Sequence, residues 1–436
     1  MNQLLKKTGI ALGAAALAFS AFVAQAADTI KVGVLHSQSG PLAISETTLK
    51  DTVLMLIEAQ NAKGGVLGKK LEAVVVDPGD QNADWSKFGV KARELIEKEK
   101  VDVIFGCWTS VSRKFTLPVV EELNGLLFYP VQYEGEESSK NIFYTGAAPN
   151  QQAIPAVDYL MEEEGVNRWV LEGTDYVYPQ TTNKILEAYL ISKGVKPADI
   201  SVNYTPFSFS DWTTRVSEIK KFGSAGKKTA VVSTINGDAN VPFYKELGNQ
   251  GISAEDIPVV AFSVGEEELK GFDTAPLVGH LAAWNYFQSA EAKANDEFIA
   301  TWKAYAKKNG IKGPYVTNDP MEATYIGFGA WVKAAEKAKS TEVDKVRAAM
   351  YGIKVPNLTG GTAEVLANHH FTKPVLIGEI QADGQFEIVS QTEEVPGDAW
   401  TDHLPESAVV VSDWQNPKVN CGNYNTKTKK CSGQNF

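Results

Sequence analysis

Short apolar runs alternate along the chain with segments whose apolar residues recur every three or four positions. A β-branched run at Ile30–Leu35 is followed by an amphipathic stretch over residues 48–62. Apolar runs bounded by turns favour buried strands, and a 3.6-residue period favours helices. The alternation continues to Pro130, with strands expected at 71–77, 101–106 and 125–130 and helices at 85–100 and 113–124. This β-α-β-α order predicts a parallel sheet with helices on both faces.

The same pattern restarts after Asn150. Strands are expected at 167–173, 201–207, 229–235 and 257–263, with helices at 151–165, 181–194, 211–223 and 240–251. Two long amphipathic helices follow at 295–310 and 321–340, and 373–389 reads as a hairpin that turns at Asp383-Gly384. A chain of 436 residues is too long for one compact core. The expected fold class is α/β, with two doubly wound parallel-sheet lobes joined by a hinge.

The first residues resemble an export signal. Lys6 and Lys7 precede an apolar stretch over residues 9–23, and Ala24-Gln25-Ala26 matches the small-residue pattern of a cleavage site. A membrane anchor is the alternative, but the apolar run is short for a span. We therefore expect a signal peptide at 1–26, cleaved near Ala26. The remaining chain carries about −13 charges, which argues against nucleic acid and anionic membranes as partners.

The expected domain boundaries follow from these two α/β units and the later return of helices. The first lobe is assigned to 27–147 plus about 277–355, the second to 148–276 plus about 356–392, and a polar tail to 393–436. Cys421 and Cys431 lie close together in that tail, and export makes a disulfide between them plausible.

The motifs of common enzymes are missing from the sequence. There is no G-x-S-x-G elbow, and the five histidines show no metal-binding spacing. Gly64–Lys70 lacks the glycine spacing of a phosphate loop, so we read it as a turn. Cys107, with Lys114 or Glu266 as helper, is the one candidate nucleophile, and it leaves a cysteine-dependent amidohydrolase as a minor alternative. A cysteine at a strand end is more often a small buried residue. We expect no catalytic residue, metal or cofactor.

Aromatic and polar residues recur where the expected strands end, which is where open α/β sheets hold ligands. The candidate ligand-binding residues are Trp108, Thr109, Ser110, Tyr133, Tyr176, Tyr178, Asp238 and Glu266. Apolar walls with a few polar groups suit a small polar ligand.

Each candidate also has a plainer reading. Trp108 would equally suit core packing, and Ser110 would suit a helix N-cap. Tyr176 and Tyr178, two apart, would face opposite ways in a strand, so only one would line the site. Asp238 and Glu266 are of a type more often found as solvated surface charges.

Several of these motifs resemble those of the type I periplasmic binding proteins of the leucine/isoleucine/valine group. The matching segments are "SGP" at 39–41, "GCWTS" at 106–110 and "YVYPQ" at 176–180. Cys107 and "VQY" at 131–133 depart from the amino-acid binders. With "YEGEE", "YTGAAPNQQ" and "GTDYVYPQ", they resemble the urea-binding receptors of ABC transporters, and next the short-chain amide receptors.

The resemblance implies a periplasmic receptor that holds urea between its lobes and delivers it to ABC permease subunits. Ser110 would hydrogen-bond the ligand with Thr109 or Tyr133 beside it, and Tyr178 or Tyr176 would stack from the second lobe, with Asp238 and Glu266 approaching from there. Urea offers N–H donors and a carbonyl acceptor without net charge, which suits hydroxyls, carboxylates and aromatic faces. Short-chain amides and branched-chain amino acids remain the next candidates.

Overall fold

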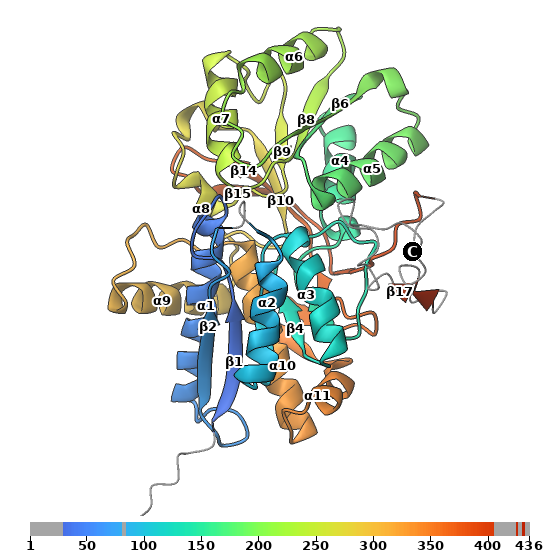
Figure 1. The fold of residues 1–436 in the computed structure, drawn as a ribbon. Coiled ribbons are helices and arrows are strands. Elements are labelled where there is room, and N and C mark those ends of the chain that lie inside the picture. The colour runs from blue at the N-terminus through green and yellow to red at the C-terminus, as the bar shows by residue number, and fades with distance from the viewer. Residues whose placement is uncertain (1–28, 81–83, 405–423, 426–429, 432–436) are drawn as a thin grey trace, which may run out of the picture.

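The computed structural model describes residues 29–80 and 84–404, together with two short strands, β17 (Tyr424–Asn425) and β18 (Lys430–Cys431). Two α/β lobes stand one above the other in Figure 1, each built on its own sheet. The expected signal peptide at 1–26 and Cys421 of the expected disulfide lie outside the described residues. No helix in the described ranges combines the length and apolar character needed to cross a membrane.

The first lobe contains a five-stranded sheet in the order β2-β1-β3-β4-β5. Every neighbouring pair in this sheet is parallel, as the sequence pattern predicts. Its strands are β1 (Ile30–Leu35), β2 (Leu71–Val76), β3 (Val103–Gly106), β4 (Leu127–Tyr129) and β5 (Ile142–Tyr144). Its helices are α1 (Ala43–Ala62), α2 (Lys87–Arg93), α3 (Ser110–Glu122), α9 (Lys293–Lys308), α10 (Asp319–Ala338) and α11 (Val343–Met350).

The second lobe contains a seven-stranded sheet in the order β15-β14-β10-β9-β8-β6-β7. Its strands are β6 (Arg168–Thr174), β7 (Ile200–Thr205), β8 (Thr229–Thr234), β9 (Val259–Ala261), β10 (Leu281–Trp284), β14 (Leu376–Ile380) and β15 (Phe386–Gln391). Its helices are α4 (Ala153–Glu162), α5 (Val177–Ser192), α6 (Thr213–Gly223), α7 (Asn240–Asn249) and α8 (Glu266–Leu269).

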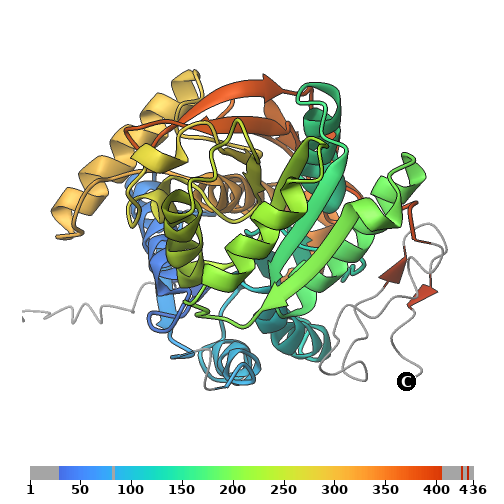
Figure 2. The same cartoon turned by 90° about the horizontal axis from the view of Figure 1, so that it is seen from above.

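The last two strands of this sheet form the expected hairpin. β14 and β15 pair antiparallel, and the turn between them places Gly384 at φ 78°, a conformation that glycine adopts without strain. Figure 2 shows this red hairpin along one edge of the upper lobe. Both faces of the sheet are covered, since Val170 belongs to one core cluster while its neighbours Trp169 and Leu171 belong to another.

The chain passes between the lobes later than the sequence pattern suggests. β10 pairs with β9 and β14 in the second sheet, so the chain returns to the first lobe after Trp284 rather than near residue 277. The next passage is also later than residue 356, because the short strands β11 (Lys354–Pro356) and β12 (Thr362–Glu364) pack Val355 and Ala363 into the core of the first lobe. Two short strands, β13 (Thr372–Lys373) and β16 (Val395–Pro396), pair antiparallel with each other. β13 comes before the hairpin in the chain, and β16 comes after it.

Candidate functional site

The lobes meet where the strands of both sheets end. Ser45 of α1 donates a hydrogen bond to Glu268 of α8 at 2.7 Å across this seam. The backbone N–H of Asp238 donates to the carbonyl of Pro41 at 3.3 Å. Val111 of α3 shares an apolar cluster with Tyr176 and Tyr178 of the second lobe. The described chain therefore has its two lobes closed on each other.

The turn between β3 and α3 supplies three of the residues expected from the sequence. Thr109, rather than Ser110, is the N-cap of α3, because its side chain accepts the N–H of Ser112 at 3.1 Å. Ser110 is the first helical residue, and its hydroxyl donates to Glu134 at 2.5 Å. Trp108 is buried just before the cap, and its carbonyl accepts the hydroxyl of Tyr129 at 2.6 Å.

A network of fully buried charges lies behind this turn. The guanidinium of Arg113 donates to Glu137 at 2.7 Å, to Glu134 at 3.1 Å and to the hydroxyl of Ser110 at 3.1 Å. Lys114 pairs with Glu137 as well. Burial raises the pKa of Glu137, but Arg113 and Lys114 outweigh that effect and bring it to about 2. Two cations and two carboxylates thus neutralise one another beside the expected site.

Three tyrosine rings surround the Arg113 guanidinium. Its central carbon lies 4.5 Å from the ring centroid of Tyr129, 4.7 Å from that of Tyr133 and 5.9 Å from that of Tyr144. The hydroxyl of Tyr133 lies 2.6 Å from Nε2 of His370. Tyr133, expected at the ligand, is therefore engaged by the buried charge network, where its ring stabilises the cation.

In the second lobe, hydrogen bonds connect the ends of three strands. The hydroxyl of Tyr176 donates to Asn236 Oδ1 at 2.7 Å, and Asn236 Nδ2 donates to the hydroxyl of Ser263 at 2.6 Å. Gln132 of the first lobe joins this chain, since its Nε2 donates to Ser263 Oγ at 2.7 Å and to the carbonyl of Phe262 at 2.8 Å. The expected site left out three residues that also follow strands and so carry the same sequence signal. They are Gln132, Asn236 and Ser263.

Tyr176 and Tyr178 do not face opposite ways, as they would in a strand. Tyr176 is the N-cap of α5 and Tyr178 lies in its first turn, so the helix begins before residue 181, where the sequence pattern placed its start. Their ring centroids are 6.2 Å apart, and both side chains are buried. Burial raises the pKa of Tyr178, and the neighbouring side chains of Gln132 and Ser263 offset part of that rise.

Three buried polar atoms at these turns make no hydrogen bond of good geometry among the described residues, although the Tyr178 hydroxyl lies close to the side chains of Gln132 and Ser263. The three atoms are the indole Nε1 of Trp108, the side-chain carbonyl of Gln132 and the hydroxyl of Tyr178. Buried indoles elsewhere, such as Trp169 and Trp331, share this property. The three lie on the turns that follow β3, β4 and β6, and they share the strand-end position with two other unpaired atoms, Nε2 of His36 after β1 and Oδ1 of Asn285 after β10. Together the three atoms offer a donor, an acceptor and a hydroxyl that does either.

The two second-lobe carboxylates expected at the ligand, Asp238 and Glu266, bond other groups instead. The side chain of Asp238 is exposed and accepts the hydroxyl of Ser208 at 3.0 Å. Glu266 is buried, and it accepts the backbone N–H of Gln288 at 2.6 Å. Burial raises its pKa to about 8. Neither residue belongs to the hydrogen-bond chain that joins Tyr176, Ser263 and Gln132.

Cys107 is buried in the first-lobe core, and burial raises its thiol pKa to about 12. A nucleophilic cysteine requires the opposite shift. Its expected helpers are engaged elsewhere, Lys114 with Glu137 and Glu266 with the backbone of Gln288. Within the described residues no group of three or more His, Cys, Asp or Glu side chains is arranged to hold a metal ion.

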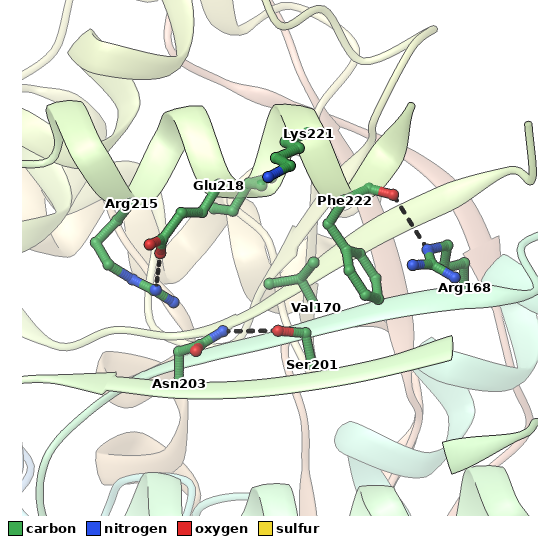
Figure 3. Close-up of a pocket in the computed structure, with 9 residues that line it drawn as sticks. Arg168, Val170, Ser201, Asn203, Arg215, Glu218, Lys221 and Phe222 are labelled. Atoms are coloured by element: carbon green, nitrogen blue, oxygen red, sulfur yellow. Dashed lines mark hydrogen bonds and ion pairs between the residues drawn. The ribbon is translucent and has the colours of Figure 1, made fainter. Parts of the chain in front are cut away.

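A surface depression of about 390 Å³ lies on the second lobe between α6 and the strands β6 and β7 (Figure 3). It is lined by residues of α6, by residues 168 and 170 of β6 and by residues 201 and 203 of β7, before the ends of both strands. Its arginines are engaged, since Arg168 pairs with Asp199 at 2.5 Å and Arg215 pairs with Glu172 at 2.8 Å. Lys221, which also lines the depression, has no ion-pair partner among the described residues, but the depression lies away from the seam and is distinct from it.

Two α/β lobes that close over their strand ends define the class of two-lobe solute-binding receptors. The chain belongs to the periplasmic binding protein family, because the model of the family described as "Periplasmic binding protein domain" matches residues 30–406. It is 25% identical over 372 residues to Leu/Ile/Val-binding protein homolog 7 of Brucella melitensis, covering 80% of this chain and 87% of that protein. It is 24% identical over 368 residues to homolog 8 of Brucella suis, covering 80% and 86%.

Solved structures share the fold. A solute-binding protein of an ABC transporter from Rhodopseudomonas palustris, in complex with p-hydroxybenzoic acid, superposes with a TM-score of 0.71 at 23% identity, covering 85% of this chain and 98% of that one. The branched-chain amino acid transporter substrate-binding protein of Streptococcus pneumoniae, in complex with isoleucine, gives a TM-score of 0.66 at 19% identity, covering 85% and 100%. Structures with this fold thus hold solutes of different chemistry.

Proposed function

We propose that this protein is the periplasmic receptor of an ABC transporter for a small uncharged amide, and that urea is its ligand. The observation that carries the proposal is the neutrality of the seam. The Lys and Arg side chains buried in the described ranges are Arg113 and Lys114, which bond Glu137, and Lys373, whose Nζ lies 3.3 Å from a Glu322 carboxylate oxygen without a hydrogen bond of good geometry. A ligand that carries a carboxylate would find no unpaired buried cation to balance it, and burying an unbalanced charge is costly.

The unpaired atoms at the seam support an amide more specifically. The indole N–H of Trp108 suits a ligand carbonyl, the side-chain carbonyl of Gln132 suits a ligand N–H, and the hydroxyl of Tyr178 suits either. Urea carries one carbonyl and four N–H groups on a planar frame. It carries a group that complements each of the three atoms. Formamide and acetamide share this chemistry and are the next candidates.

Carboxylate ligands are the main competitors, because the relatives include structures with isoleucine and p-hydroxybenzoic acid. Either ligand would place an anion near the α3 turn. There Ser110 already donates to Glu134, and Arg113 is bonded to two carboxylates. A further anion there would have no counter-charge of its own. This argument favours an uncharged ligand over an amino acid or a benzoate.

The transport role rests on the family and on the closed lobes. Receptors of this class hold the solute between two lobes that close by hinge bending and present it to membrane permease subunits. The proposed route is therefore export to the periplasm, capture of urea and delivery to a permease.

The small size of urea limits its affinity. Its four non-hydrogen atoms, at a ceiling of roughly 1.5 kcal/mol each, limit the binding free energy to about 6 kcal/mol, a dissociation constant of tens of micromolar.

Calorimetric titration of the protein after unfolding and refolding tests this proposal, because refolding removes any solute carried through purification. The ligands are urea, formamide, acetamide, isoleucine and p-hydroxybenzoate. We expect micromolar binding of urea or a short amide and no heat from the two carboxylates. Binding of isoleucine or p-hydroxybenzoate without any amide would reject the amide assignment and leave the receptor role intact. Ammonia release that is abolished in Cys107→Ala would reject the receptor role.

A further inference from the structure

The side chain of Gln132 has a fixed orientation at the seam between the lobes. One end of its amide lies 2.8 Å from the carbonyl oxygen of Phe262, which only accepts hydrogen bonds. That end must therefore be the NH₂ group. The opposite end is the carbonyl oxygen, which is buried without a hydrogen-bond partner among the described residues. The side chain as a whole is 3% exposed.

The NH₂ end of Gln132 joins the first lobe to an extended hydrogen-bond chain in the second. The hydroxyl of Ser263 accepts from both Gln132 and Asn236, and Asn236 in turn accepts from Tyr176. These bonds connect the turns that follow β6, β8 and β9 to a residue that follows β4. Gln132 is the member of this chain that lies in the first lobe, so its bonds link the two lobes in this closed arrangement.

We infer that Gln132 is a specificity-determining residue that accepts an N–H from the bound solute through its carbonyl while its NH₂ group holds the second lobe closed. The inference rests on the proposed amide-receptor function and deepens it. A solute that lacks an N–H leaves this buried carbonyl unpaired, and an unpaired buried acceptor opposes closure. A solute that supplies one removes that penalty and also orients the NH₂ group toward Phe262 and Ser263. Recognition of an N–H and closure of the lobes would thus be coupled through one side chain.

The buried residue Gln152 provides a matched control for a substitution. Its Nε2 donates to the same Phe262 carbonyl at 3.3 Å and to the carbonyl of Ala283 at 2.6 Å. It lies at the start of α4 and makes these bonds within the second lobe. Gln132→Met and Gln152→Met therefore remove the same chemical group close to the same carbonyl, but only the first removes a link between lobes.

The experiment measures urea affinity by calorimetry and urea-induced compaction by small-angle X-ray scattering in the full-length mature protein and both variants. We expect Gln132→Met to bind urea at least about 30-fold more weakly and to lose the compaction, with a melting temperature close to that of the parent. Gln152→Met should retain both responses even where its melting temperature falls. Equal urea affinity in Gln132→Met and the parent would overturn the inference and leave the amide-receptor proposal standing. A parent protein that binds no amide would overturn the proposal itself.

A second measurement needs no variant and covers the case in which Gln132→Met does not fold. Acetamide and acetone have nearly the same shape, but acetone carries a methyl group in place of the NH₂ group. We expect the parent to bind acetamide and to show no response to acetone at 100-fold higher concentration. Comparable binding of the two, within threefold, would overturn the inference, because a solute without N–H groups would then be accepted.

Discussion

The hydroxyl of Ser45, on the first helix of one lobe, lies 2.7 Å from a carboxylate oxygen of Glu268, on a short helix of the other. The other carboxylate oxygen of Glu268 accepts the N–H of Gly265 at 3.0 Å at the start of that helix. This pair is a second polar link across the seam, on α1 and α8 rather than on the turns around Gln132. The link needs the hydroxyl of Ser45, and it changes with the protonation state of Glu268. A substitution at Ser45 and a change of pH should therefore both affect closure.

Replacing Ser45 with alanine should weaken ligand binding by favouring the open arrangement. The lost hydrogen bond is worth about 1 kcal/mol, which corresponds to roughly fivefold in the dissociation constant for urea. Thr47→Ala is the control, because Thr47 lies on the same helix and bonds the carbonyl of Ala43 within it. Calorimetric titration of both variants checks the prediction. An equal loss of affinity in the two would assign the effect to the helix rather than to the link.

The stability of the protein should fall as pH rises from about 6.5 to 8, above the range in which the buried His280, His369 and His370, whose pKa burial lowers to about 4, act in the opposite sense. Burial raises the pKa of Glu268 to about 7 and that of Glu266 to about 8, from an ordinary value of 4.5. The folded state therefore binds these protons more tightly than the unfolded chain, and that stabilisation is lost as pH passes through the folded-state pKa. The charged groups nearest them are Glu267, which pairs with Lys270, and Asp319, whose pKa burial also raises.

Melting temperatures of the parent and Glu268→Gln between pH 6 and 9 test this dependence. The neutral amide cannot ionise, so the variant should lose less stability than the parent over this range. Glu97→Gln serves as the control, because Glu97 is exposed and pairs with Arg93 on the surface. Parallel curves for the parent and Glu268→Gln would contradict the prediction.

Arg113 should contribute far more to the unfolding free energy than an exposed arginine does. Removing it in Arg113→Ala leaves Glu134 and Glu137 buried with only Lys114 beside them, a change expected to cost about 3–5 kcal/mol of unfolding free energy. Arg93 also pairs with two glutamates, Glu97 and Glu122, but its side chain is 37% exposed.

Arg93→Ala should therefore lower the unfolding free energy far less than Arg113→Ala does. Urea denaturation is unsuitable for a candidate urea receptor, so guanidinium denaturation provides the comparison. Similar midpoints for the two variants would mean that the buried network contributes little to stability.

The fold followed from the sequence because its signals are local. Apolar runs such as Val103–Gly106 and the amphipathic segments between them mark each strand and helix without reference to the rest of the chain. The points at which the chain crosses between the lobes could not be predicted from these local signals. Nothing local distinguishes β10, which joins the second sheet, from a strand that returns to the first. That choice depends on pairing with β9 and β14, and β14 lies far along the sequence.

The candidate site was only partly predictable for the same reason. Strand ends indicated turns that lie at the seam, but not which of two adjacent hydroxyls caps α3 and which bonds Glu134. Arg113 resembles a surface residue at the start of a basic helix until the carboxylates of "YEGEE" are placed against it. Asp238 is the opposite case. A carboxylate after a strand suggested a ligand contact, but the side chain of Asp238 is exposed. Partners from distant segments decide these roles.

Trp108 should contribute to binding through its indole N–H as well as its ring. Trp108→Phe keeps an aromatic ring in the core but removes the unpaired N–H, so urea affinity should fall by about tenfold while the melting temperature changes little. Trp331→Phe is a close control, because Trp331 is also buried and its N–H also lacks a partner among the described residues, yet it lies on α10 in the first-lobe core. If the N–H of Trp108 bonds the urea carbonyl, only the first variant loses affinity. Unchanged urea binding in Trp108→Phe would instead make Trp108 a core residue, and the ligand carbonyl would then have to be bound by Tyr178 or by the N-terminus of α3.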